Sequence, residues 1–457
     1  MIIPVKLRNF WKSSREIVKF DPYLWFLLCL IALFFGLEFI HHFNPLAISP
    51  FESIMRLAGR DVLFSVTCLS GAIAVLCVLP IDIRERLCLV GSCFICEIVY
   101  MQWNWGAYSL IGHLALLGPI SMLFCLIILI VYLVRFALLD KITAWVVVDI
   151  MSFAVAMPLL YAIYSSFSQD SAIYDLLLLK ADSLWGFQPS FLFTRLLKCH
   201  VLVVTLMLSV YFYLPLWMMG AQIVCYTRDY SNKFIPIVRT PGIPAFTFVA
   251  VAVFGILGNY YLPAVGPSEL FDSSVFPFGI CPEIPLRSCK PLYSSALAGR
   301  SCIPCLGLTF VLCAYYTLYN IQPFWRHGWF ILSILTAASA FSIGGHWATD
   351  LLVVPPFAAF CLGLTWHRVP GKKRWLITGA CGLATFLMLW LLKTHLSWCV
   401  AHPALYWLLW IIIDTSAIAG INYMRELARV HEYELAQSRQ PYRFGRVPKE
   451  DEEEEER

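Results

Sequence analysis

The stretch "VLVVTLMLSVYFYLPLWMMGAQIVC" (Val201–Cys225) carries no acidic or basic side chain over its whole length. A helix of about 20 apolar residues is long enough to cross the hydrocarbon core of a bilayer. The whole chain is biased in the same way: 60% of its 457 residues are hydrophobic, 14% are charged, and the mean hydropathy is +0.73. Soluble domains average about 45–50% apolar and about 25% charged residues. The sequence therefore predicts an all-α polytopic membrane protein.

Apolar blocks of this kind recur along the chain and predict about twelve transmembrane helices. They lie near residues 23–40, 62–80, 87–103, 110–133, 144–166, 201–225, 243–265, 303–320, 329–345, 347–366, 375–393 and 403–424. The first block follows a basic segment and has no signal-peptidase site of the A-x-A type, so we expect it to remain as an anchor.

Basic residues predict how these helices are oriented, because Lys and Arg concentrate in cytoplasmic loops. One topology agrees with all the strongly basic segments, and it places both termini in the cytoplasm. The long loops 167–200 and 266–302 and the start of the tenth helix then lie on the outer or lumenal side. We expect the membrane to be a bacterial inner membrane or a eukaryotic organelle membrane. The acidic end "KEDEEEEER" (residues 449–457) is typical of a solvated tail.

Two ionisable residues, His346 and Asp350, interrupt apolar sequence at the outer edge of the tenth predicted helix. Residues four apart share one face of a helix, so the carboxylate can accept a hydrogen bond from one ring nitrogen. The other nitrogen is then available as a nucleophile or base. Ionisable groups at membrane spans are often functional, although a hydrogen-bonded pair that only packs two helices is the alternative.

The outer loop 266–302 supplies three candidate phosphate ligands, Arg287, Lys290 and Arg300. Arg300 directly precedes the predicted helix at 303–320, so we expect it near His346. For Arg287 and Lys290, contact with lipid headgroups is an alternative role.

Three further stretches share the order and content of a known set of motifs. They are "DSLWGFQPSF" (Asp182–Phe191), "GNYYLPAVGPSELF" (Gly258–Phe271) and "GGHWATDLL" (Gly344–Leu352). Together they resemble the type 2 phosphatidic acid phosphatase superfamily, most closely its inositol phosphorylceramide synthase branch. The resemblance covers about residues 175–366 and implies a core of six transmembrane helices.

The resemblance also implies a mechanism. The histidine of the last motif, here His346, attacks phosphorus and forms a transient phosphohistidine, and Asp350 orients it. No metal or other cofactor is expected, because cationic side chains and the histidine perform the chemistry.

The middle motif of that family is degenerate here. The family has an arginine and, a few residues later, the sequence Pro-Ser-Leu-His, whose histidine protonates the leaving group. In "RSCIPCLG" (Arg300–Gly307) the serine position is Cys305 and the histidine position is Gly307. Loss of a positioned acid typically costs about 10²–10⁴-fold in rate. An arginine that many members carry six residues before the nucleophile is also replaced, by Ala340.

Another group could replace the missing donor, and two histidines are candidates. His200 begins the sixth predicted helix on the outer side, whereas His327 falls on the inner side. The stretch "KFIPIVRTP" (Lys233–Pro241) resembles the first motif of the superfamily, but the topology places it in the cytoplasm. We therefore reject it as a phosphate clamp.

Four of the 17 cysteines lie in or beside the outer loop: Cys281, Cys289, Cys302 and Cys305. In an oxidising compartment they would favour disulfides, with reduced thiols or a zinc site as alternatives. Cys302 and Cys305 also form a C-x-x-C at the start of a predicted helix, where a thiolate is stabilised. This arrangement resembles membrane disulfide oxidoreductases such as the vitamin K epoxide reductases.

We expect four regions: 1–143, with four helices; 144–366, the six-helix core; 367–424, with two helices; and 425–457, a charged cytoplasmic tail.

The expected function is hydrolysis or transfer of a phosphate or phosphoalcohol headgroup on a lipid-linked phosphate. An inactive relative that binds phospholipid or a partner, and a thiol–disulfide oxidoreductase, are the alternatives. The acidic residues Glu38, Glu97, Asp149 and Asp414 within predicted helices leave a transporter open. The expected partners are membrane lipids and not nucleic acid, and the oligomeric state stays open.

Overall fold

The computed structural model describes residues 22–43, 82–103, 174–197, 201–231, 244–271, 303–319, 323–342, 344–366 and 371–439, with 49, 66–67, 70–73, 127, 156, 159–160, 163 and 369. The regular elements among these residues are helices, which agrees with the predicted all-α class. The predicted helices near 62–80, 110–133 and 144–166 fall mostly outside the described residues.

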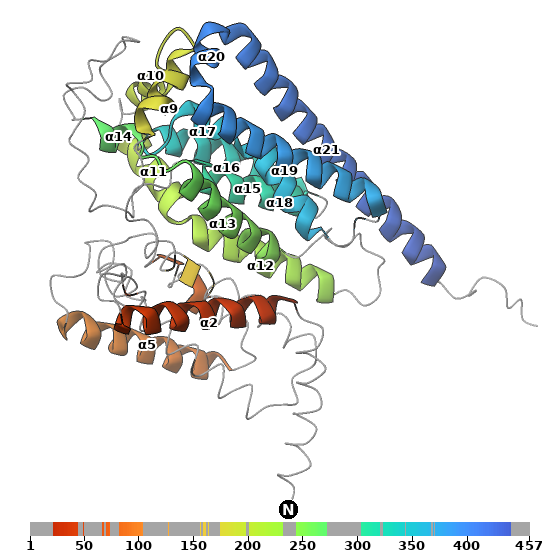
Figure 1. Cartoon of the computed structure of the whole chain (residues 1–457). Helices are drawn as coiled ribbons and strands as arrows, with labels where there is room; N and C mark the ends of the chain where they lie inside the picture. Colours follow the sequence, from red (N-terminus) through yellow and green to blue (C-terminus); the bar gives the residue numbers. More distant parts are fainter. Residues whose placement is uncertain are drawn as a thin grey trace, which may run out of the picture.

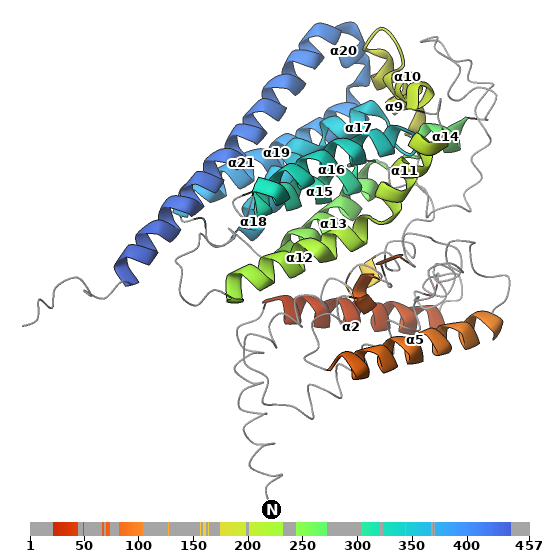
Figure 2. The ribbon, with the colours of Figure 1, turned by 180° about the vertical axis from the view of Figure 1, so that it is seen from behind.

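A bundle of long helices forms the main body, and its members run side by side in both views (Figures 1 and 2). They are α11 (Val201–Phe212), α12 (Leu214–Ser231), α13 (Pro244–Tyr261), α15 (Leu306–Leu318), α16 (Pro323–Ser342), α18 (Val354–Thr365), α19 (Gly371–Thr394) and α21 (Pro403–Arg439). Two more helices, α2 (Pro22–Phe43) and α5 (Ile83–Trp103), belong to the N-terminal region.

Short helices gather at one end of this bundle (Figure 1). They are α9 (Asp175–Ser183), α10 (Pro189–Leu197), α14 (Pro267–Leu270), α17 (Ala348–Leu352) and α20 (Leu396–Ala401). The chain enters α21 at this end, and the last turns of α21 extend past the opposite end of the bundle.

Within the described part of the chain, four segments are long and apolar enough to cross a membrane: Pro244–Tyr261, Ala348–Thr365, Gly371–Thr394 and Pro403–His431. A bent pair, Pro189–Leu197 with Leu202–Phe212, would make a fifth, and its two helices meet at 116°. These segments identify the chain as a membrane protein.

Prolines divide two helices that were predicted to be continuous. The predicted span 201–225 is broken between α11 and α12, and Pro215 occupies the first turn of the second helix. The predicted span 347–366 is likewise divided at Val353, just before Pro355 and Pro356 at the start of α18. Proline has no N–H to donate and is tolerated only in the first turn of a helix. The apolar runs thus predicted helices at these positions but not the breaks within them.

Glycines allow α18 and α19 to pack closely against each other. A Cβ at Gly363 would lie 2.1 Å from Oγ1 of Thr378, and one at Gly382 would lie 2.8 Å from Cδ2 of Phe360. Small residues at such crossings let helix backbones approach closely. Close packing matters in a membrane because lipid tails are as apolar as the side chains, so the hydrophobic effect does not drive the helices together. The crossing holds α18 firmly, and α18 continues directly from the short helix that carries Asp350.

Candidate functional site

The turn that presents His346 is built at the C-terminus of α16. The N–H of Gly344 donates to the carbonyl of Phe341 at 2.8 Å, and the N–H of Gly345 donates to the carbonyl of Ala340 at 3.2 Å. This pair of bonds is the Schellman arrangement, which needs a left-handed residue at the first position after the cap. Gly344 supplies it, with φ of +67°. The chain therefore reverses sharply and enters the extended segment that contains His346.

His346 does not lie on a helix, so the expected shared helical face is wrong. It precedes Trp347, the N-cap of α17, whereas Asp350 is the third residue of that helix. The Asp350 carboxylate bends back and accepts the Trp347 N–H at 2.7 Å through Oδ2. The same oxygen lies 3.6 Å from Nδ1 of His346. A capping interaction, rather than helical periodicity, brings the two side chains together.

Both members of the His346–Asp350 pair are buried, with exposed fractions of 4% and 0%. The other ring nitrogen, Nε2 of His346, lies 3.1 Å from the hydroxyl of Tyr211 on α11. A carboxylate facing Nδ1 favours the tautomer with the proton on that nitrogen. Nε2 then carries the lone pair and accepts the phenolic hydrogen. This arrangement can present an imidazole whose Nε2 is nucleophilic.

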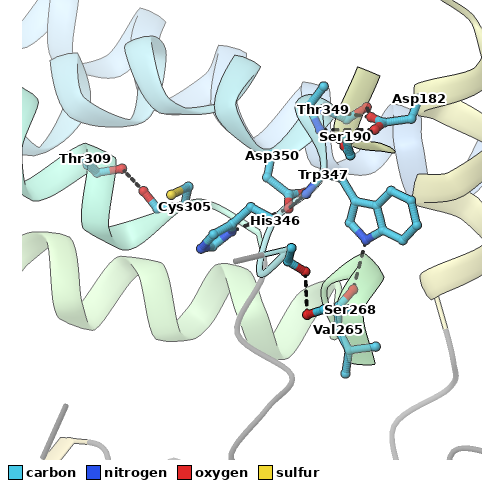
Figure 3. Close-up of polar contacts among 12 residues, drawn as sticks. Asp182, Ser190, Val265, Ser268, Cys305, Thr309, His346, Trp347, Thr349 and Asp350 are labelled. Carbon is cyan, nitrogen blue, oxygen red and sulfur yellow. Dashed lines mark hydrogen bonds and ion pairs between the residues drawn. The ribbon is translucent and has the colours of Figure 1, made fainter. Parts of the chain in front are cut away.

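A second buried carboxylate, Asp182, caps α17 from a distant segment (Figure 3). Its Oδ1 accepts from the Thr349 N–H at 3.0 Å and from the Thr349 hydroxyl at 2.9 Å. Its Oδ2 accepts from the Ala348 N–H at 3.2 Å and from the Ser190 hydroxyl. A carboxylate at this position satisfies N–H groups that have no partner within the helix. The cap fixes the start of the helix that carries Asp350.

Burial raises the pKa of Asp182 from an ordinary 3.8 to about 6, since removal from water disfavours the charged form. The hydrogen bonds from Ser190, Thr349 and Ala348 act in the opposite direction and limit the rise. The carboxylate therefore titrates close to the physiological range.

A third segment, Val265 to Ser268, packs under the His346 turn. The indole N–H of Trp347 donates to the carbonyl of Val265 at 2.9 Å, and the N–H and hydroxyl of Ser268 both donate to the carbonyl of Gly344 at 3.0 and 2.9 Å. Gly266 is pressed so closely against this turn that a Cβ would lie 2.4 Å from the oxygen of Gly344. The three quoted stretches that begin at Asp182, Gly258 and Gly344 thus meet at one place.

The fourth stretch lies on the other side of Tyr211. A Cβ at Gly307 on α15 would lie 3.2 Å from Cε2 and 3.7 Å from Cζ of the Tyr211 ring. Cys305 is a buried free thiol and packs in an apolar cluster with Ala340 and Val354. Cys305 and Gly307, where this sequence departs from the middle motif, are therefore small residues in apolar surroundings, and the Tyr211 ring lies beside Gly307.

The remaining predicted residues are distributed as follows. His327 is exposed near the start of α16, about 22 Å of helix from its C-terminal end, so it cannot replace a donor at His346. Several predicted residues lie outside the described part of the chain: Arg287, Lys290, Arg300, Cys281, Cys289, Cys302 and His200.

Sequence reasoning missed the roles of Asp182, Ser190 and Tyr211. Asp182 and Ser190 stand in one of the quoted stretches, where a polar pair in an otherwise apolar segment could have drawn attention. Tyr211 stands in an uninterrupted apolar run. The one signal that could have pointed to it is the glycine at position 307, which faces the Tyr211 ring.

The fold and the site define the class of protein: an α-helical membrane protein with a buried His–Asp pair where the short helices meet its bundle. No protein-family model matches the chain, and no curated protein or solved structure is significantly similar to it.

Proposed function

We propose that the protein is a membrane lipid phosphatase or phosphoalcohol transferase that forms a phosphohistidine on His346. The observation that carries this proposal is the double anchoring of the imidazole, by Asp350 at Nδ1 and Tyr211 at Nε2. The substrate is a lipid-linked phosphate at the outer or lumenal face. The proposal includes the twelve-helix topology, a six-helix core over residues 144–366 and cytoplasmic termini.

In the first step Nε2 of His346 attacks phosphorus, and the bond from phosphorus to the leaving oxygen breaks. The imidazole gains positive charge as the N–P bond forms, and the buried Asp350 carboxylate stabilises it. In the second step an acceptor oxygen attacks phosphorus and releases the histidine. Water as acceptor gives hydrolysis, whereas an alcohol gives headgroup transfer.

The phosphate carries negative charge that the protein must balance. Arg300 is the proposed ligand, since it precedes the described residues Ile303 to Cys305 by only a few positions. Lys290 and Arg287 are proposed to assist it. The location of His346 also supports headgroup chemistry, since short helices and turns gather at that end of the bundle (Figure 1).

The proposal is tested with the purified full-length protein in lipid nanodiscs. Phosphate release and headgroup exchange are measured on phosphatidate, a polyprenyl diphosphate and phosphatidylinositol, and acid-labile protein phosphorylation is measured in parallel. We expect His346→Ala to abolish turnover and labelling. His402→Ala is the matched control, because His402 is exposed and lies just before α21. Turnover that persists in His346→Ala would contradict the phosphohistidine mechanism.

A second candidate function is phospholipid binding without catalysis, and the apolar occupants of the degenerate motif favour it. Gly307 and Ala340 provide neither a proton donor nor a cation, and Cys305 provides only a thiol buried among apolar side chains. In that case the wild-type protein neither releases phosphate nor becomes labelled, and Arg300→Gln weakens lipid binding. The thiol–disulfide alternative is disfavoured for Cys305, because a thiol buried in an apolar cluster is a poor nucleophile.

A further inference from the structure

The phenol of Tyr211 occupies the space between the histidine and the degenerate motif. Its hydroxyl lies 3.1 Å from Nε2 of His346, the nitrogen proposed to attack phosphorus. The edge of the same ring faces Gly307, so a larger side chain at that position would collide with it. The Tyr211 side chain thus lies within hydrogen-bond distance of Nε2 of His346 and also occupies the space beside Gly307.

We propose that Tyr211 is the proton donor and acceptor of the reaction, in place of the group that position 307 lacks. This inference rests on the proposed function and adds a catalytic residue to it. A phenol has an ordinary pKa of about 10, so it stays protonated at neutral pH. The alkoxide that leaves a lipid phosphate is a stronger base than a phenolate, so proton transfer to it is favourable.

The steps balance without another reactant. As the bond between Nε2 and phosphorus forms, the P–O bond breaks and its electron pair moves to the leaving oxygen, which takes the phenolic proton. The Tyr211 phenolate then removes the proton of the acceptor, water or alcohol. The acceptor oxygen bonds to phosphorus, the P–N bond breaks, and both His346 and Tyr211 return to their starting states.

Substrate binding must move the hydroxyl from its resting position. In the free protein the hydroxyl lies 3.1 Å from Nε2. With the ring proton on Nδ1, the hydroxyl donates to the lone pair of Nε2, which is the direction from which phosphorus must approach. When phosphorus takes that place, the oxygens on phosphorus, including the leaving oxygen, come within reach of the hydroxyl as acceptors. The resting bond therefore becomes the catalytic one after a small rotation of the side chain.

The helix that carries Tyr211 is held in place one turn earlier. The hydroxyl of Ser339 on α16 donates to the carbonyl of Leu335 at 2.6 Å and contacts the sulfur of Met207 on α11 at 3.5 Å. Met207 and Tyr211 are four residues apart and face the same side of α11. This contact ties the phenol to the helix whose C-terminal turn presents His346, as general acid catalysis requires.

The test compares Tyr211→Phe with Tyr213→Phe, a matched control whose side chain is 41% exposed at the break after α11. Each variant is assayed in nanodiscs on phosphatidate, which has an alkoxide leaving group, and on p-nitrophenyl phosphate, whose leaving group needs no protonation. We expect Tyr211→Phe to lose about 10²–10⁴-fold on phosphatidate and less than about fivefold on the aryl ester. Tyr213→Phe should change neither rate by more than about twofold.

A swap supplies the second measurement. Tyr211→Ala combined with Gly307→His removes the ring and places an imidazole at the vacated position. The double variant should recover turnover on phosphatidate relative to Tyr211→Ala alone. Its rate should also fall as pH rises past about 6.5, where a histidine donor loses its proton.

Equal losses of Tyr211→Phe in the rate of phosphohistidine formation from both substrates would show that the phenol only orients His346, and this would overturn the inference. Full activity of Tyr211→Phe on phosphatidate, with His346→Ala inactive, would overturn it while leaving the proposed function intact. Absence of turnover and labelling in the wild-type protein would remove both proposals together.

Discussion

The ring of His346 has a polar side chain beside each nitrogen, and these two neighbours orient the buried imidazole. Asp350 faces Nδ1 at 3.6 Å and Tyr211 faces Nε2 at 3.1 Å. The sequence predicted the first partner from the spacing of two ionisable residues. It did not predict the second, because a tyrosine among apolar residues of a membrane helix carries no local signal.

The role of the Asp350 charge is tested by Asp350→Asn. An amide of the same size keeps an oxygen for the Trp347 N–H but has no charge to stabilise the imidazolium. We expect phosphate release to fall by about 10²–10⁴-fold, with a change in thermal unfolding temperature of only a few degrees. Labelling kinetics measured before steady state should show slow formation of phosphohistidine. A rate unchanged from wild type would exclude Asp350 from the mechanism.

The raised pKa of Asp182 makes stability depend on pH in a defined window. The folded protein keeps the Asp182 proton up to about pH 6, whereas the unfolded chain loses it near 3.8. Unfolding therefore releases a proton between these values, and the free energy of unfolding falls by about 3 kcal/mol as pH rises through them.

The measurement is the difference in thermal unfolding temperature between wild type and Asp182→Asn, taken from pH 4 to pH 7. Wild type should lose stability relative to the variant up to about pH 6 and then run parallel to it. A difference that stays constant across the range would assign Asp182 an ordinary pKa.

At the scale of elements, the short helix α17 depends on caps supplied by other parts of the chain. Five residues form too short a helix to be stable alone. Asp182 and Ser190 satisfy its first N–H groups, Val265 accepts from its N-cap residue, and α18 continues from its end. Hydropathy predicted a helix that starts near residue 347, but not the hydrogen bonds from more than 150 residues away that cap it.

Close packing of α14 against the His346 turn is tested by Gly266→Ala. The new Cβ would lie 2.4 Å from the oxygen of Gly344 and 2.5 Å from the carbonyl carbon of Gly345, and backbone atoms cannot rotate away. We expect a loss of about 1–3 kcal/mol in stability and at least a tenfold loss of turnover, because the turn must shift.

Gly379→Ala on α19 is the matched control, since nothing lies within 4 Å of its added Cβ. Alanine favours a helix by about 1 kcal/mol over glycine, so this variant should be as stable as wild type or more stable. Normal turnover in Gly266→Ala would mean that the turn tolerates displacement without loss of the His346 geometry.

At the scale of the whole molecule, the site and the C-terminal end of α21 lie at opposite ends of the bundle (Figures 1 and 2). Trp407, near the start of α21, donates to the carbonyl of Leu184 beside the site, and the whole helix is 37 residues long. At about 1.5 Å per residue it is about 55 Å long, which exceeds the thickness of the hydrocarbon core. Composition and hydropathy predicted the membrane class, whereas the meeting of distant segments at one end required the structure.

The proposed orientation is tested in sealed vesicles with the outer face exposed. An antibody against a C-terminal tag should bind only after permeabilisation, whereas a lipid phosphate in the exposed leaflet should be hydrolysed before it. Antibody binding to intact vesicles, with an intact internal control epitope, would place the tail and the site on the same side and contradict the topology.

The cap made by Asp182 also has a consequence for biosynthesis. Asp182 is synthesised 166 residues before Ala348, whose backbone N–H donates to the Asp182 carboxylate. Until the later segment is in place, the Asp182 carboxylate lacks the hydrogen bonds from Ala348 and Thr349 that compensate for its burial. His346 and Asp350 belong to the same later segment. The capped start of α17, and with it the pairing of His346 with Asp350, therefore forms only when the two parts of the chain join.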